Sequence, residues 1–292
     1  MNKFNKVIVA LDLSENDDQV LNYLDYLVEP LEIKQLISAH VLPVLLVGGI
    51  VKFAAGEILL PVAPALDVIH SNIEKKTKNL VKSKALDINV RLVEGRPYKE
   101  LLFLVEELKP DLLVMGKKKS MSGSGITAKR MARHITSDLL LIPEDSKSGV
   151  NRILVAVDFS TYSLRAIKRS ISLTKKLGLK QAPMCLNVID MPNYTEFSNR
   201  EEIAQELPEI INGKFEKFLD EHNVDINDVD FHFTKTNNYN IAKTIKRYAR
   251  AEGADLIMMG AKGHNILERF LLGSVAESMV DDYVNTPVYI IR

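Results

Sequence analysis

An internal repeat constrains the fold of this chain more than any other feature. An apolar run that ends in Asp-x-Ser occurs at residues 7–14 and again at 153–160. The run Asp-Leu-(Leu/Ile)-(Val/Met)-Met-Gly occurs at 111–116 and again at 255–260. Both pairs are separated by about 145 residues, a period far longer than that of a solenoid repeat. The sequence therefore predicts two tandem copies of one domain.

Each copy alternates short apolar runs with amphipathic stretches, which is the pattern of a parallel sheet covered by helices. The polar stretch 143–149 separates the copies, so we expect α/β domains at residues 1–145 and 150–292. Strands are expected at 7–11, 36–41, 88–93, 111–115 and 139–142, and then at 153–157, 184–188, 230–234, 256–259 and 288–291. Helices are expected at 14–28, 65–84, 98–108, 126–134, 163–177, 201–222, 241–251 and 274–283.

Composition narrows the class of protein. The 292 residues include 38 basic and 38 acidic side chains, so the net charge does not favour a nucleic acid as partner. The single cysteine, Cys185, cannot form an intrachain disulfide and fits a reducing compartment. No apolar leader precedes the first predicted strand. We therefore expect a cytoplasmic protein.

The most apolar stretch, residues 41–66, is interrupted by Lys52, Glu57 and three prolines. No run in it reaches the roughly 18 apolar residues that a membrane span needs. We therefore expect no membrane span. The insertion at 43–64 is interpreted as a loop packed on its own domain, as a pocket lining or as an oligomer surface.

A glycine-rich segment in the second copy carries the candidate binding chemistry. Gly260, Gly263 and Gly273 stand at spacing G-x2-G-x9-G, and Ser274 follows directly as the start of a capping-box pattern. The segment thus joins a strand end to a helix N-terminus, where N–H groups are unpaired and negative charge is favoured. Glycine allows positive φ and the close approach of a ligand. The segment predicts a phosphate cradle.

The first predicted strand of each copy ends in an acidic residue, Asp12 and Asp158. In open α/β sheets, ligands bind beyond the carboxyl ends of the strands. A carboxylate there can accept hydrogen bonds from ribose hydroxyls or reach a phosphate-bound Mg²⁺. The alternative is that Asp158 caps the turn that follows it.

The glycine motif, the run 272–277 and the repeated strand-end aspartates resemble the universal stress protein family, the UspA-like proteins, over nearly the whole chain. The resemblance implies two Rossmann-like domains, each a five-stranded parallel sheet in order 3-2-1-4-5. It implies ATP with Mg²⁺ in the second domain. The residues that it assigns to the nucleotide are Gly260, Gly263, Gly273, Ser274 and the N–H of Val275 for the phosphates, Asp158 for the ribose or Mg²⁺, and the backbone of Val188 for adenine.

The resemblance also bears on assembly, because the family usually pairs its last strands across a dimer. Residues 139–142 and 288–291 are therefore candidates to pair within one chain as an intramolecular pseudo-dimer. A homodimer is a further expectation.

The first copy departs from the glycine pattern, because Lys119 replaces the second glycine. A side chain there would stand where backbone must approach phosphate, so we predict weak or no ATP binding in this half. Gly123-Ser124-Gly125 is interpreted as a remnant of the Gly-Ser pair. Residues 123–128 also match G-x-G-x-x-A, but they lie several residues past their strand. The lysines at 117–119 form either a solvated loop or a site for an anion or acidic partner.

Dedicated catalytic chemistry is missing from the sequence. It has no P-loop and no zinc-ligand spacing among its six histidines, and no base stands beside Ser274. His264, within the glycine segment, is either a phosphate contact or a solvent-facing loop residue. We expect no catalytic residue and at most slow ATP hydrolysis. The leading hypothesis is an ATP-binding regulatory protein of the stress response. The alternatives are a slow ATPase or nucleotidyl transferase, and a scaffold or apolar-ligand binder that uses residues 43–64.

Overall fold

The computed structural model describes most of the chain, and the side chains of all described residues except 46–47, 50–51, 60–65, 124–125 and 200–204. The described residues are 4–42, 46–47, 50–51, 60–83, 85–119, 124–190, 200–236, 240–263 and 272–292. They form two compact units, Met1–Ser148 and Gly149–Arg292. The change of unit falls at the polar stretch 143–149.

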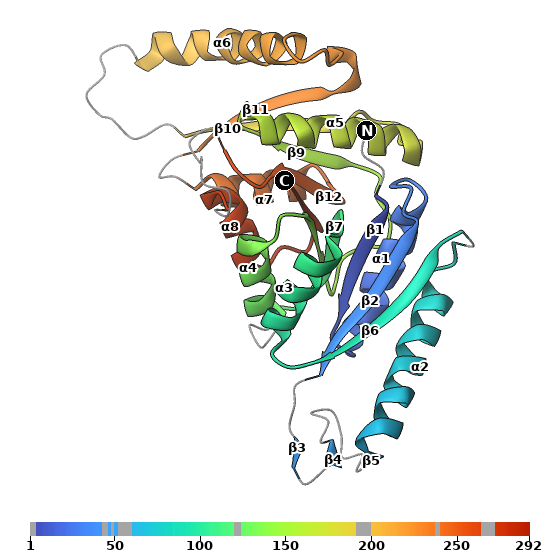
Figure 1. Cartoon of the computed structure of the whole chain (residues 1–292). Coiled ribbons are helices and arrows are strands. Elements are labelled where there is room, and N and C mark those ends of the chain that lie inside the picture. The colour runs from blue at the N-terminus through green and yellow to red at the C-terminus, as the bar shows by residue number, and fades with distance from the viewer. Residues whose placement is uncertain are drawn as a thin grey trace. The chain divides into compact units, whose positions relative to one another are not determined.

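The first unit is built on a parallel sheet with β1 at its centre (Figure 1). β1 pairs with β2 on one side and β7 on the other, β2 pairs with β6, and β7 pairs with β8. The central strand is apolar and mostly buried, whereas the outer strand β6 alternates between exposed and half-buried residues. The bounds are β1 Lys6–Leu11, β2 Gln35–Leu42, β6 Asp87–Glu94, β7 Leu112–Lys117 and β8 Asp138–Pro143.

A second, smaller sheet distinguishes the first unit from the plain five-stranded domain that we expected. Three short antiparallel strands form it: β3 Leu46–Val47, β4 Ile50–Val51 and β5 Leu60–Pro61. They lie in the apolar insertion. Since the side chains of residues 43–65 fall outside the described part of the chain, the expected roles of this insertion stay predictions.

The second unit repeats the pairing scheme, with β9 between β10 and β12. β11 pairs with β10, β13 pairs with β12, and every pair is parallel. The bounds are β9 Ile153–Val157, β10 Met184–Asp190, β11 Asp230–Thr236, β12 Leu256–Gly260 and β13 Val288–Ile291. In both units the strand order brings residues from distant parts of the sequence to the same carboxyl edge of the sheet.

Helices connect the strands in both units, as the alternating pattern predicts. The bounds are α1 Asn16–Val28, α2 Val62–Leu80, α3 Pro97–Leu108, α4 Ser124–His134, α5 Thr161–Leu177, α6 Arg200–Asp220, α7 Ile241–Ala251 and α8 Ser274–Asp281, with a 3₁₀ turn at Ile226–Asp228. In the first unit α3 packs beside α4, and in the second α7 packs beside α8 (Figure 1). No helix among the described residues is long and apolar enough to span a membrane.

Local chemistry explains how α5 begins and ends. Its N-cap is Ser160, whose hydroxyl oxygen accepts a hydrogen bond from the Ser163 N–H at 3.2 Å. Its C-cap is Gly178, which has a left-handed φ of 64°. The corresponding expectation for α1 is wrong: the N-cap is Glu15, not Ser14, and no side chain in the described part of the chain caps the helix. The hydroxyl of Ser14 instead donates to Asp12.

Candidate functional site

A cavity of about 430 Å³ lies at the carboxyl edge of the second unit's sheet, where β9, β10 and β12 end. All seven residues that the sequence analysis selected line it: Asp158, Val188, Gly260, Gly263, Gly273, Ser274 and Val275. Val188 and Gly260 lie on β10 and β12, Asp158 directly follows β9, and the others belong to the glycine segment and the start of α8. The fold thus brings together residues that are up to 117 positions apart in the sequence, as positions 158 and 275 show.

Asp158 uses its two carboxylate oxygens differently. Oδ1 accepts hydrogen bonds from the N–H and the hydroxyl of Ser160, at 3.1 and 2.6 Å. This oxygen therefore caps the turn, as the alternative interpretation proposed. Oδ2 lies beside Gly263, where an added Cβ would come within 2.7 Å of it. The second oxygen thus faces the space that glycine keeps open, so turn capping and ligand binding are compatible.

The motif glycines are not needed for left-handed backbone. None of Gly260, Gly263 and Gly273 has a positive φ. A Cβ on Gly260 would lie 2.6 Å from the Cβ of Tyr162 and 2.9 Å from that residue's carbonyl carbon, so Gly260 lets α5 pack against the end of β12. Gly263 leaves room beside Asp158. The expected use of positive φ is therefore wrong, and what glycine provides at these two positions is close approach.

The first turn of α8 faces the cavity without a side-chain cap. The N-cap is Gly273 and not, as expected, Ser274, which is the first helical residue. The Gly273 N–H donates to the carbonyl of Ala261 at 2.8 Å, which fixes the helix start against the glycine segment. Because no side chain among the described residues caps this helix, its first N–H groups suit an anion.

Several cavity residues were missed by the sequence analysis. Asn187 precedes Val188 on β10, and its amide donates to the Val157 carbonyl at 2.8 Å. A polar residue within an apolar run was the signal for it. Ile241 and Ile245 line the cavity from one face of α7, and their i, i+4 spacing after a strand could have indicated this wall. Val188 also lies two residues before the end of β10, instead of at it.

Part of the predicted loop is not testable here. Residues 264–271, including His264, fall outside the described residues, as do residues 120–123 of the first half. Among the described residues, no group of three or more His, Cys, Asp or Glu side chains is arranged to hold a metal ion.

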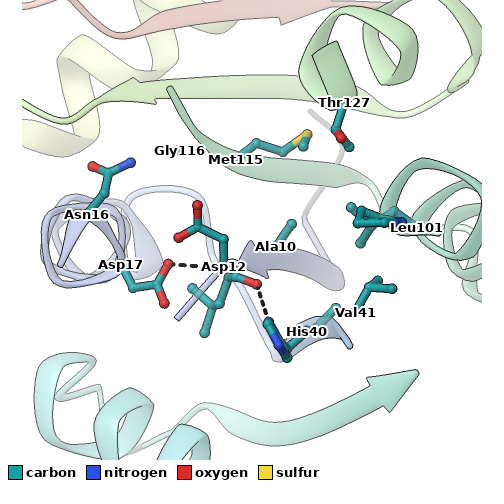
Figure 2. Close-up of a pocket in the computed structure, with 13 residues that line it drawn as sticks. Ala10, Asp12, Asn16, Asp17, His40, Val41, Leu101, Met115, Gly116 and Thr127 are labelled. Atoms are coloured by element: carbon teal, nitrogen blue, oxygen red, sulfur yellow. Dashed lines mark hydrogen bonds between the residues drawn. The ribbon is translucent and has the colours of Figure 1, made fainter. Parts of the chain in front are cut away.

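The first unit has a cavity of about 290 Å³ at the equivalent carboxyl edge (Figure 2). Its polar lining residues are Asp12, Asn16, Asp17, His40 and Thr127. Its apolar wall is formed by residues of β1, β2, α3 and β7, namely Ala10, Leu11, Ala39, Val41, Pro97, Leu101 and Met115. The equivalent location has thus kept a cavity but lined it with different chemistry.

A lysine, Lys118, takes up the space beside Asp12. The Nζ of Lys118 lies 2.7 Å from Asp12 Oδ2, and Lys119 pairs with Asp145 at 2.9 Å. Burial raises the pKa of Asp12, but hydrogen bonds from Lys118 and Ser14 outweigh this, so the net pKa is lower than usual. Lys119 stands at the position that aligns with Gly263. The oxygen that faces open space in the second unit is ion-paired in the first.

Two further groups of the first cavity titrate abnormally. Burial raises the pKa of Asp17 to about 6, although its carboxylate accepts hydrogen bonds from the N–H groups of Asp12 and Leu13 at 3.1 and 2.9 Å. Burial lowers the pKa of His40, whose Nδ1 lies 2.8 Å from the Leu11 carbonyl oxygen. Figure 2 shows both side chains around the end of β1. Perturbed groups gathered at a cavity are typical of binding sites.

Comparison with known proteins identifies the family. A sequence model of the universal stress protein family matches residues 3–143 and 149–292. A Staphylococcus aureus (strain USA300) protein named for this family is 33% identical over 135 residues, which is 44% of this chain and 76% of the relative. The chain therefore belongs to the universal stress protein family, with two tandem domains.

Solved structures agree with the fold. A universal stress protein from Archaeoglobus fulgidus matches with a TM-score of 0.65 and 18% identity, over 100% of this chain and 99% of that one. A protein of Pseudomonas aeruginosa UCBPP-PA14 named for the family matches with a TM-score of 0.65 and 11% identity, over 99% of this chain and 93% of that one. At these identities the likeness establishes the tandem α/β fold alone.

Proposed function

We propose that this universal stress protein binds one ATP, as its Mg²⁺ complex, in the second unit, and that nucleotide occupancy serves regulation in the stress response. The observation that carries the proposal is the cavity of about 430 Å³ on which the seven predicted residues converge. An uncapped helix start and an open space beside Asp158 lie on its border. Phosphates suit the helix start, and ribose hydroxyls or Mg²⁺ suit the carboxylate.

The roles follow from position. The N–H groups at the start of α8 and the bare backbone at Gly263 would hold the phosphates. The apolar wall of Val188, Ile241 and Ile245 would contact adenine. Mg²⁺, when bound with the nucleotide, would neutralise phosphate charge, and Asp158 Oδ2 is the group of this chain suited to reach it.

The strand pairings support this arrangement. Numbered by the main-sheet strands of each unit, the neighbours follow the order 3-2-1-4-5, so the first and fourth strands end side by side. That places the strand-end carboxylate next to the glycine segment, where open α/β sheets bind ligands.

A regulatory role is favoured over catalysis. Among the described residues that line the second cavity, Asp158 is the one carboxylate, and one of its oxygens already caps a turn. Among the described lining residues, no second carboxylate and no histidine stands there to activate water. A slow ATPase is the remaining enzymatic alternative. Turnover that survives repeated purification and disappears in Asp158→Ala would favour it.

Assembly and location complete the proposal. From the family resemblance we propose that residues 139–142 pair with 288–291 within the chain, and that the protein is cytoplasmic. Analytical ultracentrifugation at micromolar concentration distinguishes a monomer, whose terminal strands pair within the chain, from a homodimer that forms through a further surface.

Calorimetry with Mg-ATP tests the nucleotide proposal. The wild-type protein should bind one ATP per chain, and Gly263→Lys, which copies the first half, should lose binding. Asp158→Asn should weaken ATP by about tenfold or more, whereas its matched control, Asp12→Asn, should change the affinity little. Two equal sites, or full binding by Gly263→Lys, would refute the assignment to the second unit.

A further inference from the structure

A further cavity in the second unit, here called the α7 cavity, lies between the end of β11 and the first turns of α7. It has a volume of about 400 Å³. Two of its lining residues, Thr236 and Thr244, are 7% and 4% exposed, and the Thr244 hydroxyl donates a hydrogen bond to Thr236 Oγ1 at 3.0 Å. The other lining residues have exposed polar or charged side chains: Lys235, Asn240, Lys243 and Arg247. The lining is therefore polar throughout.

The charge of the α7 cavity is positive. Among the described residues, its lining includes three cations, Lys235, Lys243 and Arg247, and no carboxylate. None of these three side chains forms an ion pair in the part of the chain that the structure describes. Residues 237–239, which connect β11 to α7 in the sequence, are Asn-Asn-Tyr and include no acidic residue. The three positive charges thus have no counter-charge within the unit.

This arrangement of charges is unfavourable for the folded chain unless an anion offsets it. Lys243 and Arg247 stand at i and i+4 on α7, where like charges destabilise a helix. By contrast, Lys246 of the same helix lies 2.7 Å from Asp282 and so has a counter-charge. Departures from local stability rules are expected at functional sites. The uncompensated cations therefore indicate a bound anion, and the alternative is a solvated basic face of α7.

The α7 cavity is distinct from the cavity proposed for ATP. Ile241 and Ile245 of α7 line the cavity proposed for ATP, whereas Lys243 and Arg247 line the α7 cavity. The two pairs are offset by two positions, which is about 200° around an α-helix. Opposite sides of α7 therefore face the two cavities, and each side carries different chemistry.

We propose that the α7 cavity binds a phosphate group, either as inorganic phosphate or as the phosphate of a small monoester. The guanidinium group of Arg247 and the ammonium groups of Lys235 and Lys243 would donate charge-assisted hydrogen bonds to its oxygens. A phosphate monoester carries about 1.5 to 2 negative charges at pH 7, so it offsets more of the three positive charges than one carboxylate does. The site does not depend on ATP binding.

Three anions test the chemistry of the ligand. The full-length protein without nucleotide is titrated at constant ionic strength with inorganic phosphate, phenyl phosphate or benzoate, and binding is followed by protein-detected NMR. Both phosphates should shift the amide signals of residues 240–247 and should bind about tenfold more tightly than benzoate. Tighter binding of phenyl phosphate than of inorganic phosphate would identify a monoester as the ligand, and the reverse would identify free phosphate. Equal affinity for benzoate and the two phosphates would overturn the proposal.

A matched pair of variants separates a site from a general basic surface. Arg247→Met removes a cation that lines the cavity, and Arg250→Met removes an exposed cation one turn further along α7 that does not line it. Both side chains are exposed, so neither variant should disturb the core. Phosphate affinity should fall about tenfold in Arg247→Met and less than about twofold in Arg250→Met. Equal losses would identify a solvated basic helix face and end the proposal.

A further variant separates the α7 cavity from the cavity proposed for ATP, which is also expected to attract phosphate. Gly263→Lys should lose Mg-ATP binding but keep phosphate binding at residues 240–247, whereas Arg247→Met should show the reverse. Phosphate binding that is lost in Gly263→Lys and kept in Arg247→Met would place the anion in the other cavity and refute the proposal. Failure of the wild-type protein to bind ATP would count against the proposed function alone, because the phosphate readout does not depend on ATP.

Discussion

The turns that follow β1 and β9 have the same backbone conformation but differ in the residue that lies beside the aspartate carboxylate. Asp12 and Asp158 each accept two hydrogen bonds from the serine two residues later. The residue between them has a left-handed φ in both units, 61° at Leu13 and 63° at Phe159. Lys118 then meets the open oxygen in one unit, whereas Gly263 leaves it clear in the other. A common frame thus presents two different sites.

The strained residue is also supported differently in the two units. Phe159 is buried and packs edge-on against Phe215 and Phe218 of α6, with ring centroids 6.5 and 5.6 Å apart. Leu13 is 42% exposed, and instead its N–H is held by the carboxylate of Asp17. Left-handed φ at a bulky residue costs about 1–3 kcal/mol, so each unit needs such support. Aromatic packing stabilises the left-handed residue in the second unit, and a hydrogen bond to the buried Asp17 carboxylate stabilises it in the first.

The largest expected difference concerns the glycine that ends the fourth main strand. In Gly260→Ala the new Cβ meets the backbone and Cβ of Tyr162, so the second unit should lose about 2–3 kcal/mol of unfolding free energy. In Gly116→Ala it meets the end of the flexible Asn16 side chain, and the loss should stay below about 1 kcal/mol. Hydrogen exchange resolved by unit measures both, and equal losses would contradict the difference in packing.

A smaller effect is expected from the ion pair of the first unit. Lys118→Met removes the group that most lowers the pKa of Asp12, so that pKa should rise in the variant. Because the pair is partly exposed, the stability cost should be at most about 1 kcal/mol. A carboxyl-carbon NMR titration measures the pKa, and Lys119→Met, whose partner is Asp145, serves as the control.

A difference in pH dependence should follow from the second strand. His40 contacts the Leu11 carbonyl, whereas Asn187 donates to the equivalent Val157 carbonyl. Since the folded-state pKa of His40 is lowered, the unfolded chain takes up more protons below pH 6.5, and stability falls as pH decreases. His40→Asn should remove this loss while changing stability at pH 7 by no more than about 1 kcal/mol.

The wild-type minus variant difference is the quantity to measure, because Asp17 acts in the opposite direction. Its folded-state pKa of about 6 lies above the ordinary 3.8, so the folded state binds more protons in that window and stability rises as pH falls. Urea unfolding between pH 7.5 and pH 5 should give a difference that grows toward acid. A difference that is constant with pH would contradict the role assigned to His40.

The last variant, Lys119→Gly, should leave the number of ATP sites unchanged. Lys119→Gly restores the second glycine of the motif in the first unit. Lys118 still forms its ion pair with Asp12, however, and two carboxylates still line the cavity. Calorimetry of this variant with Mg-ATP should detect no additional site. An added site would show that one side chain alone separates the two units, which would sharpen the comparison in favour of the sequence motif.

Much of the fold could be predicted from the sequence because its signals are local. Apolar runs and amphipathic stretches placed the main strands and helices within a few residues of their observed bounds, and the repeat predicted two similar domains. The seven candidate residues line one cavity because strand ends and helix starts carry recognisable residue types. The prediction that Ser14 and Ser274 are helix N-caps was wrong, because hydrogen-bond geometry decides which residue caps a helix.

The sequence by itself determined the duplication, the parallel α/β architecture and the loss of one motif glycine in the first half. Tertiary structure alone decided that Gly260 serves packing, that Lys118 reaches Asp12, and that a cavity with buried His40 and Asp17 remains where no ATP motif is left. The physical reason is that periodicity and turn chemistry act between near neighbours, whereas cavities and pKa values arise from side chains that the parallel strands bring together from distant parts of the chain.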